Sequence, residues 1–393
     1  MGYKTYTCPI AKTCGGCEWL AVPYPIQLRR KQEFVEDLFA QMADEDGAAI
    51  AAVRGMDEPL AYRYKAATPF APGKKGRIRS GFYAAGSHRI VRCEQCLVED
   101  PRARDILNAV AHVAERLHIP AYEEDRGTGC LRHAVLRTGY ATDDVLLTVV
   151  TNGERLPRKE RFADEVRAAC PEVTSLVQNV NDRRTNAILG RTCKTLFGPG
   201  VMHDKLLGCT FEIGPTSFYQ TNPAQTEVLY GLALDAARLE SGMRVLDAYC
   251  GTGTIGICAA SAAPDVEIMG VEQVGGAISC AKRNAQTNGV AERCRFLRAD
   301  ATAYLKQAAT EGTEHFDVVI MDPPRAGSTP EFLNAVARMA PARVVYVSCN
   351  AVTQARDLEV LRERGYRLEL LTPVDMFPHT KHVETVCLLT HKG

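Results

Sequence analysis

The stretch Phe-Asp-Val-Val-Ile-Met-Asp-Pro-Pro-Arg at residues 316–325, with Arg-Val-Val-Tyr-Val-Ser-Cys-Asn at residues 343–350, decides the fold. Each segment has the pattern of a short buried strand of β-branched residues that runs directly into a polar side chain, Asp322 in the first and Cys349 in the second. Open α/β sheets hold their ligands at the carboxyl ends of parallel strands. The sequence therefore predicts that a carboxylate and a thiol face the same crevice.

An alternation of strands and helices surrounds this stretch, from Leu239 onward. Residues 244–256, Arg-Val-Leu-Asp-Ala-Tyr-Cys-Gly-Thr-Gly-Thr-Ile-Gly, indicate a strand, a glycine turn and the start of a helix. Strands are predicted at 244–248, 267–272, 294–300, 316–321, 343–348, 366–371 and 384–390. Seven strands with intervening helices are typical of a doubly wound, Rossmann-like sheet in an α/β fold.

The earlier part of the chain has a mixed pattern. Its apolar spacing predicts helices at 25–42, 101–117 and 158–169, strands at 62–70 and 78–92, and a hairpin over 131–150. We therefore expect three parts. They are an N-terminal cysteine segment with its helix (1–60), an α+β central domain (61–215) and the Rossmann-like domain (216–393).

The composition is that of a soluble globular protein, with 46% hydrophobic and 24% charged residues. No apolar run approaches the roughly 18 residues of a membrane span, and the N-terminus has no apolar signal region. We expect a cytoplasmic protein with no membrane partner, and a monomer by default. The formal net charge is +0, so the overall charge gives no indication of a polyanionic partner such as nucleic acid. Local basic clusters, such as the one at 74–79, gain weight only if the chemistry points to nucleic acid.

Three cysteines lie close together near the N-terminus. Fifteen cysteines without an export signal favour thiols, metal binding or catalysis over a disulfide framework. Cys8, Cys14 and Cys17 form a C-x5-C-x2-C run, and either Cys93 or Cys96 can supply a fourth ligand. Zinc sites and iron–sulfur clusters both use four cysteines, so the spacing leaves both open beside unrelated buried cysteines.

The glycine turn at 251–256 and the acidic Glu272 after the next strand fit two cofactors. Nicotinamide dinucleotides and S-adenosylmethionine both need glycines for close backbone approach and an acid for the ribose hydroxyls. Three further acids at strand ends favour S-adenosylmethionine, namely Asp247, Asp300 and Asp322. Asp-Pro-Pro at the end of the fourth strand is typical of methyltransferases, because its prolines stiffen the backbone that holds polar groups at the target base.

Motifs along most of the chain together resemble the RNA uracil-C5 methyltransferases, which make 5-methyluridine in ribosomal and transfer RNA. They are the four-cysteine pattern and the segments 217–222 (Ser-Phe-Tyr-Gln-Thr-Asn), 246–253 (Leu-Asp-Ala-Tyr-Cys-Gly-Thr-Gly), 321–327 (Met-Asp-Pro-Pro-Arg-Ala-Gly), 346–350 (Tyr-Val-Ser-Cys-Asn) and 382–386 (His-Val-Glu-Thr-Val). The resemblance implies S-adenosylmethionine as cofactor and RNA as partner. It favours 23S ribosomal RNA, with transfer RNA as the alternative.

The resemblance also implies residue roles. Cys349 is expected to be the nucleophile and Glu384 the base. Contacts to the cofactor or the target base are expected from Gln220, Tyr249, Gly251, Glu272, Asp300 and Asp322. A [4Fe–4S] cluster is favoured over zinc on the resemblance alone, with Cys8, Cys14, Cys17 and Cys96 as ligands.

The chain departs from the family pattern at three points. Ala351 follows Cys-Asn where the family commonly has proline, so the loop after the nucleophile is expected to differ. Cys93 is an extra cysteine beside Cys96. Cys8 lies too near the N-terminus for the small RNA-binding barrel of many members, so RNA binding is expected from the central domain and its basic clusters.

Each of these residue types suits methylation of a pyrimidine carbon. C5 of uracil is too weak a nucleophile to attack a sulfonium methyl group unaided, whereas a thiolate added at C6 makes the ring an enolate. A base then removes the C5 proton so that the thiolate can leave. The target uridine has to leave its stack, and stacking candidates are Phe218, Tyr219 and Phe377.

Three other classes remain open on the residues alone. An amino-group methyltransferase also uses Asp-Pro-Pro but needs no cysteine nucleophile. An iron–sulfur electron-transfer protein would bind a nicotinamide dinucleotide at the glycine turn. A non-catalytic RNA-binding module would need none of Cys349, Glu384 and Asp322.

Overall fold

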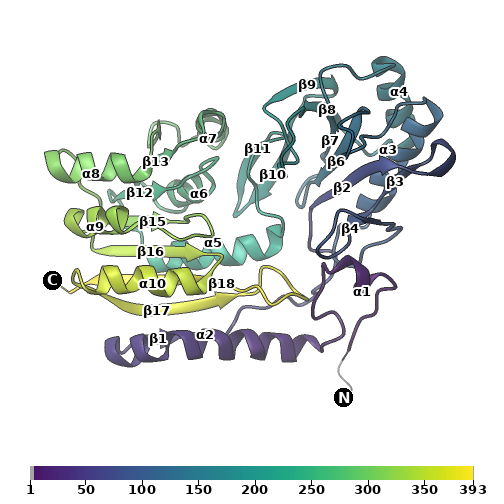
Figure 1. Cartoon of the computed structure of the whole chain (residues 1–393). Helices are drawn as coiled ribbons and strands as arrows, with labels where there is room; N and C mark the ends of the chain where they lie inside the picture. The colour runs from purple at the N-terminus through teal and green to yellow at the C-terminus, as the bar shows by residue number, and fades with distance from the viewer. Residues whose placement is uncertain (1–3, 393) are drawn as a thin grey trace.

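The computed structural model describes residues 4–392, and its two main sheets lie side by side, each with helices packed against it (Figure 1). The larger sheet has eight strands in the order β1-β17-β18-β16-β15-β12-β13-β14. Their bounds are β1 Ala49–Ile50, β12 Arg244–Ala248, β13 Glu267–Glu272, β14 Cys294–Arg298, β15 Val318–Met321, β16 Arg343–Ser348, β17 Tyr366–Val374 and β18 Glu384–His391. The seven predicted strands are present, but the predicted count is wrong by one.

The extra strand is β1, which pairs in parallel with β17 through Ala49 and Ile50. It has two residues and lies in an alanine-rich stretch, so it offers no alternation from which a strand could be predicted. The sheet is also mixed, because β18 runs antiparallel to both of its neighbours, β16 and β17.

Helices cover both faces of the large sheet because each contributes an apolar stripe to one of two cores. One core contains side chains of α5, α6 and α7, and the other contains side chains of α2, α8, α9 and α10. The bounds are α2 Tyr24–Asp46, α5 Pro223–Ala237, α6 Thr254–Ala262, α7 Gly275–Thr287, α8 Ala301–Glu311, α9 Pro330–Met339 and α10 Ala351–Arg362. This layering leaves the carboxyl ends of the parallel strands uncovered.

The central sheet has six strands in the order β3-β2-β6-β7-β8-β9, and α3 and α4 cover one of its faces. Its elements are β2 Lys65–Pro72, η1 Lys74–Gly76, β3 Ile78–Ser80, α3 Ala103–Arg116, β6 Leu131–Thr138, β7 Val145–Thr151, α4 Lys159–Ala169, β8 Ser175–Val180 and β9 Thr192–Phe197. The predicted hairpin over 131–150 is confirmed as β6 and β7.

The continuous strand predicted at 78–92 is wrong. The chain forms β3, then β4 (Phe82–Tyr83) and β5 (Ile90–Val91), which pair only with each other. Gly81 separates β3 from β4 with φ of 149°, and a Cβ atom there would lie 1.9 Å from the carbonyl oxygen of Val91. Only glycine permits this approach, and it breaks the strand.

A hairpin joins the two sheets. It consists of β10 (Met202–Leu206) and β11 (Cys209–Ile213), whose apolar side chains pack in the core that also holds α5 and α6. Leu146 and Val177 of the central sheet belong to the same core. The central sheet is therefore held against the large sheet by continuous apolar packing, and the space between them has fixed walls.

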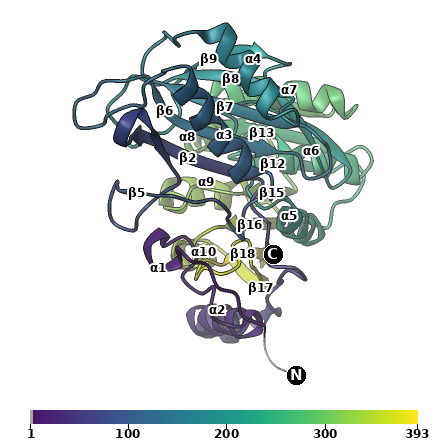
Figure 2. The same ribbon diagram turned by 90° about the vertical axis from the view of Figure 1, so that its right-hand side faces the viewer.

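The N-terminal segment braces the large sheet from below (Figure 2). After the short α1 (Ala11–Cys14), α2 packs along β17 and α10. Its buried Lys31 forms an ion pair with Asp375, and the hydroxyl of Tyr24 donates to the same carboxylate over 2.8 Å. Because Asp375 opens the connection from β17 to β18, α2 fixes the loop that leads to Glu384. Within residues 4–392, no helix is long and apolar enough to cross a membrane.

Candidate active site

A cavity of about 980 Å³ lies between the carboxyl ends of the large sheet's strands and the first residues of β2. This volume suffices for a nucleoside cofactor together with part of a second ligand. Its lining includes all of the predicted catalytic and cofactor-binding residues except Asp300, namely Gln220, Tyr249, Gly251, Glu272, Asp322, Cys349 and Glu384. Two sheets from distant parts of the sequence thus form one pocket.

The floor of the pocket is the glycine turn between β12 and α6. Asp247, the fourth residue of β12, accepts a hydrogen bond from the backbone nitrogen of Gly256 over 2.9 Å. A Cβ atom at Gly256 would lie 2.8 Å from that carboxylate and from Ile268, so only glycine lets α6 pack this closely on the sheet. Burial raises the pKa of Asp247 to about 7. Asp247 therefore holds the turn in place.

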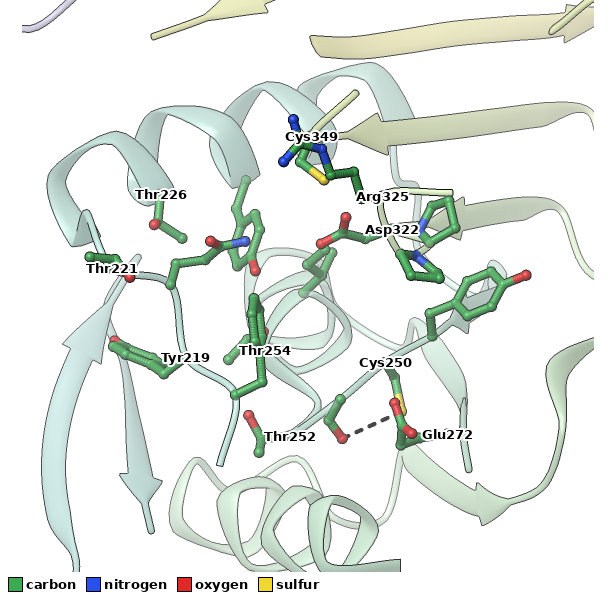
Figure 3. Close-up of a pocket in the computed structure, with 18 of the residues that line it drawn as sticks. Tyr219, Thr221, Thr226, Cys250, Thr252, Thr254, Glu272, Asp322, Arg325 and Cys349 are labelled. Carbon is green, nitrogen blue, oxygen red and sulfur yellow. Dashed lines mark hydrogen bonds between the residues drawn. The ribbon is translucent and has the colours of Figure 1, made fainter. Parts of the chain in front are cut away.

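Glu272 and Asp322 mark opposite ends of the pocket. In Figure 3, Glu272 lies near Cys250 and Thr252, whereas Asp322 lies with Arg325 and Cys349 at the far end. One carboxylate oxygen of Glu272 accepts from the backbone nitrogen of Val274 over 2.8 Å, which fixes its orientation. The pocket thus has one end beside the glycine turn and another beside the thiol, which we call the reactive end because it holds the predicted nucleophile.

Asp300 lies outside the pocket lining. One of its oxygens accepts from the backbone nitrogen of Ala303 over 2.9 Å and so caps α8. The other accepts from the side-chain amide of Gln273 over 2.7 Å. The predicted contact of Asp300 with the cofactor stays a prediction, and the observed role of the side chain is to cap a helix.

Cys349 and Glu384 meet because β16 and β18 are antiparallel. Ser348, at the end of β16, pairs with Thr385 in β18, so the next residue on each strand in that direction is Cys349 and Glu384. Asn350 then caps α10 by accepting from the backbone nitrogen of Val352 over 3.2 Å. The thiol is thus held between a strand end and a helix start.

Ala351 occupies the first position of α10. Proline is also favoured there, because its fixed φ suits a helix start and its missing N–H is not needed. The expectation that alanine changes the loop beyond Cys349 therefore finds no support, since either residue allows this backbone.

Three acidic side chains at the reactive end have raised pKa values. Burial raises the pKa of Asp322 to about 7, and burial together with the charge of Asp322 raises the pKa of Glu384 to about 8. The pKa of the Cys349 thiol is also raised, first by burial and then by Glu384 and Asp322, while Arg325 acts in the opposite direction. The free protein therefore holds a thiol beside carboxyl groups that exchange protons near neutral pH.

Sequence reasoning missed several pocket residues. Tyr230 on α5 lines the cavity, and the side chains of Thr254 and Gln220 hydrogen-bond its hydroxyl. Arg63 and Lys65, at the start of β2, also line it. The i, i+4 spacing of Thr226 and Tyr230 predicts one helix face, but nothing in it indicates that this face borders a cavity.

The N-terminal cysteines gather near the start of β2. Burial, with smaller contributions from Cys96, Cys14 and Cys8 and against the charge of Arg63, raises the pKa of the Cys17 thiol to about 11. Cys93 is 2% exposed, and its thiol donates to the carbonyl of Gln95 over 3.1 Å. The chemistry of this donor set suits zinc or iron–sulfur, yet no three His, Cys, Asp or Glu side chains within residues 4–392 are arranged to hold a metal ion.

Comparison with known proteins supplies the family. Residues 239–367 match the family model described as a methyltransferase domain. A protein of Halalkalibacterium halodurans named as an uncharacterized RNA methyltransferase is 41% identical over 386 residues, which cover 98% of this chain and 83% of that protein. A protein of Staphylococcus aureus strain COL with the same description is 40% identical over 98% of this chain and 84% of its own length. The chain belongs to the RNA methyltransferases.

A solved structure extends this likeness to the whole fold of the RNA methyltransferase. The tRNA (uracil-54, C5)-methyltransferase of Pyrococcus abyssi, in complex with S-adenosyl-L-homocysteine, is 27% identical with a TM-score of 0.77. The match covers 98% of this chain and 87% of that one. The N-terminal segment, the central sheet and the large sheet therefore share one arrangement in both proteins.

Proposed function

We propose that this RNA methyltransferase transfers the methyl group of S-adenosylmethionine to C5 of a uridine in RNA, through a covalent bond between Cys349 and C6. The observation that carries the proposal is that Cys349, Asp322 and Glu384 interact at one end of the pocket. The glycine turn and Glu272 lie at the other end (Figure 3). Methylation of an exocyclic nitrogen needs no thiol at this place.

The glycine turn and Glu272 suit S-adenosylmethionine. Backbone around Gly251 permits close approach, and Glu272 has a carboxylate oxygen free for ribose hydroxyls. The cofactor supplies an electrophilic methyl group on a sulfonium. Its adenosine then belongs beside Glu272 and its methyl group beside Asp322, and the Pyrococcus abyssi relative binds the demethylated form of this molecule.

The residues at the reactive end divide the reaction into two steps. The Cys349 thiolate adds to C6, and the C5–C6 π electrons move into an enolate. Its C5 attacks the methyl carbon as the bond from that carbon to the sulfonium sulfur breaks, and a neutral thioether leaves. Glu384 then removes the C5 proton, the C5–C6 double bond re-forms and the bond from C6 to sulfur breaks. Asp322, with a pKa near 7, is suited to hydrogen-bond the uracil edge and to hold the ring against the thiol.

The proposed substrate is 23S ribosomal RNA, the class of RNA that the resemblance to the RNA uracil-C5 methyltransferases favours. Transfer RNA is the second candidate, and the similarity to the Pyrococcus abyssi tRNA enzyme favours it. Phe218 lines the pocket and is 68% exposed, which makes it available to stack on a nucleobase.

Transfer of a labelled methyl group tests the function. Unmodified 23S ribosomal RNA and transfer RNA transcripts are incubated with the protein and labelled S-adenosylmethionine, then digested to nucleosides. We expect label in 5-methyluridine from one of the two RNAs, which identifies the substrate class. Label in a methylated amino nucleoside would contradict the C5 assignment while leaving the RNA methyltransferase family intact.

We also propose that Cys8, Cys14, Cys17 and Cys96 bind a [4Fe–4S] cluster that braces the N-terminal segment. Supporting this are the chemistry of four thiols, their mutual effect on the pKa of Cys17, and the position of Cys93 in a separate hydrogen bond. We expect protein purified without oxygen to contain about four iron and four sulfide per chain, and Cys17→Ser to lose both. Cys93→Ser should keep them. Stoichiometric zinc without sulfide would overturn the proposal.

A further inference from the structure

The start of β2 and the residues just before it form a cationic wall of the active-site pocket. Arg63, two residues before β2, lines the cavity together with Lys65 and Ala67, which share one face of the strand, and with the neighbouring Ala66. They come from the central sheet, whereas Asp322 and Glu384 line the cavity from the large sheet. The pocket therefore has a basic wall and an acidic wall that face the same space.

The cations of the basic wall are poorly neutralised. Within residues 4–392 the ammonium group of Lys65 makes no hydrogen bond or ion pair, and burial together with the charge of Arg137 lowers its pKa to about 8. Lys65 and Arg137 are directly opposite each other in the β2–β6 ladder, an arrangement in which like charges destabilise a sheet. Among the described residues, the Nε of Arg63 is buried without a hydrogen-bond partner, although the guanidinium is also hydrogen-bonded to the side chain of Tyr62.

Arg137 differs from Lys65 in having a local partner. It donates to the carbonyl of Ser217, which precedes the pocket residues Phe218, Tyr219 and Gln220. Arg137 therefore holds that segment, and Lys65 is left as an unpaired charge in the cavity. Such an arrangement costs folding free energy, which suits a group whose partner is a ligand.

The two walls of the pocket favour different parts of a nucleotide. A phosphodiester carries a negative charge, and it finds no counter-charge in the carboxyl groups of Asp322 and Glu384, which are buried beside Cys349. A uracil ring is neutral and offers N–H and C=O groups to those same carboxyl groups. A nucleotide that places its base at Cys349 is therefore expected to turn its phosphate toward β2.

We propose that Lys65, with Arg63 beside it, is the binding site for an RNA backbone phosphate at the target uridine. The inference rests on the proposed function. It adds that the Lys65 ammonium group holds the target nucleotide after the uridine has left its stack. The phosphate supplies the counter-charge that the protein itself does not provide. Binding of the phosphate at Lys65 and Arg63 thereby orients the nucleotide with its base toward Cys349. The contact does not distinguish one base sequence from another, as is usual for phosphate contacts.

The test is Lys65→Met in a Cys349→Ala background, which binds RNA without turnover. We expect the dissociation constant for unmodified 23S ribosomal RNA, or for transfer RNA if that is the methylated substrate, to rise about tenfold, the loss of one charge-assisted contact. The slope of log affinity against log salt should fall by about 0.7, the value for one phosphate. Lys65→Arg should restore both. Lys159→Met, at an exposed position on α4, is the control.

Thermal stability separates this role from a structural one. Because Lys65 is an unpaired charge opposite Arg137, Lys65→Met should have a melting temperature equal to or above that of the parent. A lowered melting temperature with an unchanged salt slope would overturn the phosphate site. The salt slope does not depend on which atom is methylated. Failure of the proposed function would instead appear in the methyl-transfer assay, as label in a nucleoside other than 5-methyluridine.

Discussion

Cys349→Ala is expected to abolish methyl transfer, with a loss of roughly 10⁴-fold or more, as found when a covalent nucleophile is removed. The reason is that the enolate at C5 forms only after sulfur adds to C6. Binding of S-adenosylmethionine should change little, because Glu272 and the glycine turn lie at the other end of the pocket. Initial rates with labelled cofactor and equilibrium binding of the cofactor measure the two effects separately.

A matched control is Cys193→Ala, which removes an exposed cysteine of β9 that is not among the residues lining the pocket. It should keep full activity. If Cys349→Ala also kept full activity, covalent catalysis would be ruled out, and methylation of an exocyclic nitrogen beside Asp-Pro-Pro would become the better interpretation. Burial and two nearby carboxyl groups raise the pKa of the Cys349 thiol. Because only the thiolate adds to C6, we expect the rate of adduct formation to increase with pH.

Glu384→Gln is expected to stop the reaction after methyl transfer, so that an RNA–protein adduct accumulates. Without a base the C5 proton remains and the sulfur cannot leave C6. We expect turnover to fall by about 10²- to 10⁴-fold, and a band of increased mass to appear on a denaturing gel when RNA and S-adenosylmethionine are both present. The double variant with Cys349→Ala should give no such band.

Glu331→Gln, at an exposed position on α9, is the control and should turn over normally. A Glu384→Gln protein that turns over normally would assign the base to another residue. One that is inactive without forming an adduct would mean that Glu384 acts before or during addition of the thiol, rather than after it.

The pKa of Glu384 also predicts a dependence of stability on pH. Its folded value is about 8, above the ordinary value of 4.5, because burial and Asp322 disfavour the charged form. Between these two values the unfolded chain loses the proton and the folded chain keeps it, so this group lowers stability as pH rises from about 4.5 to about 8. Glu384→Gln should therefore gain melting temperature relative to wild type as pH rises through this window.

The order of elements in the Rossmann-like part could be predicted from the sequence because its signals are local. Short, mostly apolar segments ending at Ala248, Met321 and Ser348 mark buried strands, and the glycines after Ala248 mark a turn into a helix. In contrast, β1 has two residues and no periodicity, and the split at Gly81 depends on the close approach of Val91. Both features arise from contacts between distant segments.

The sequence by itself determined which residues stand at strand ends and hence that Asp322 and Cys349 share a crevice, because parallel strands present the same end. Only the tertiary structure decided that Glu384, at the start of its strand, joins them, because β18 runs antiparallel between β16 and β17. It also decided the opposite wall, since Lys65 reaches the pocket through packing of one sheet against another. Strand patterns depend on neighbours in the chain, whereas strand direction and sheet packing depend on which distant surfaces bury each other.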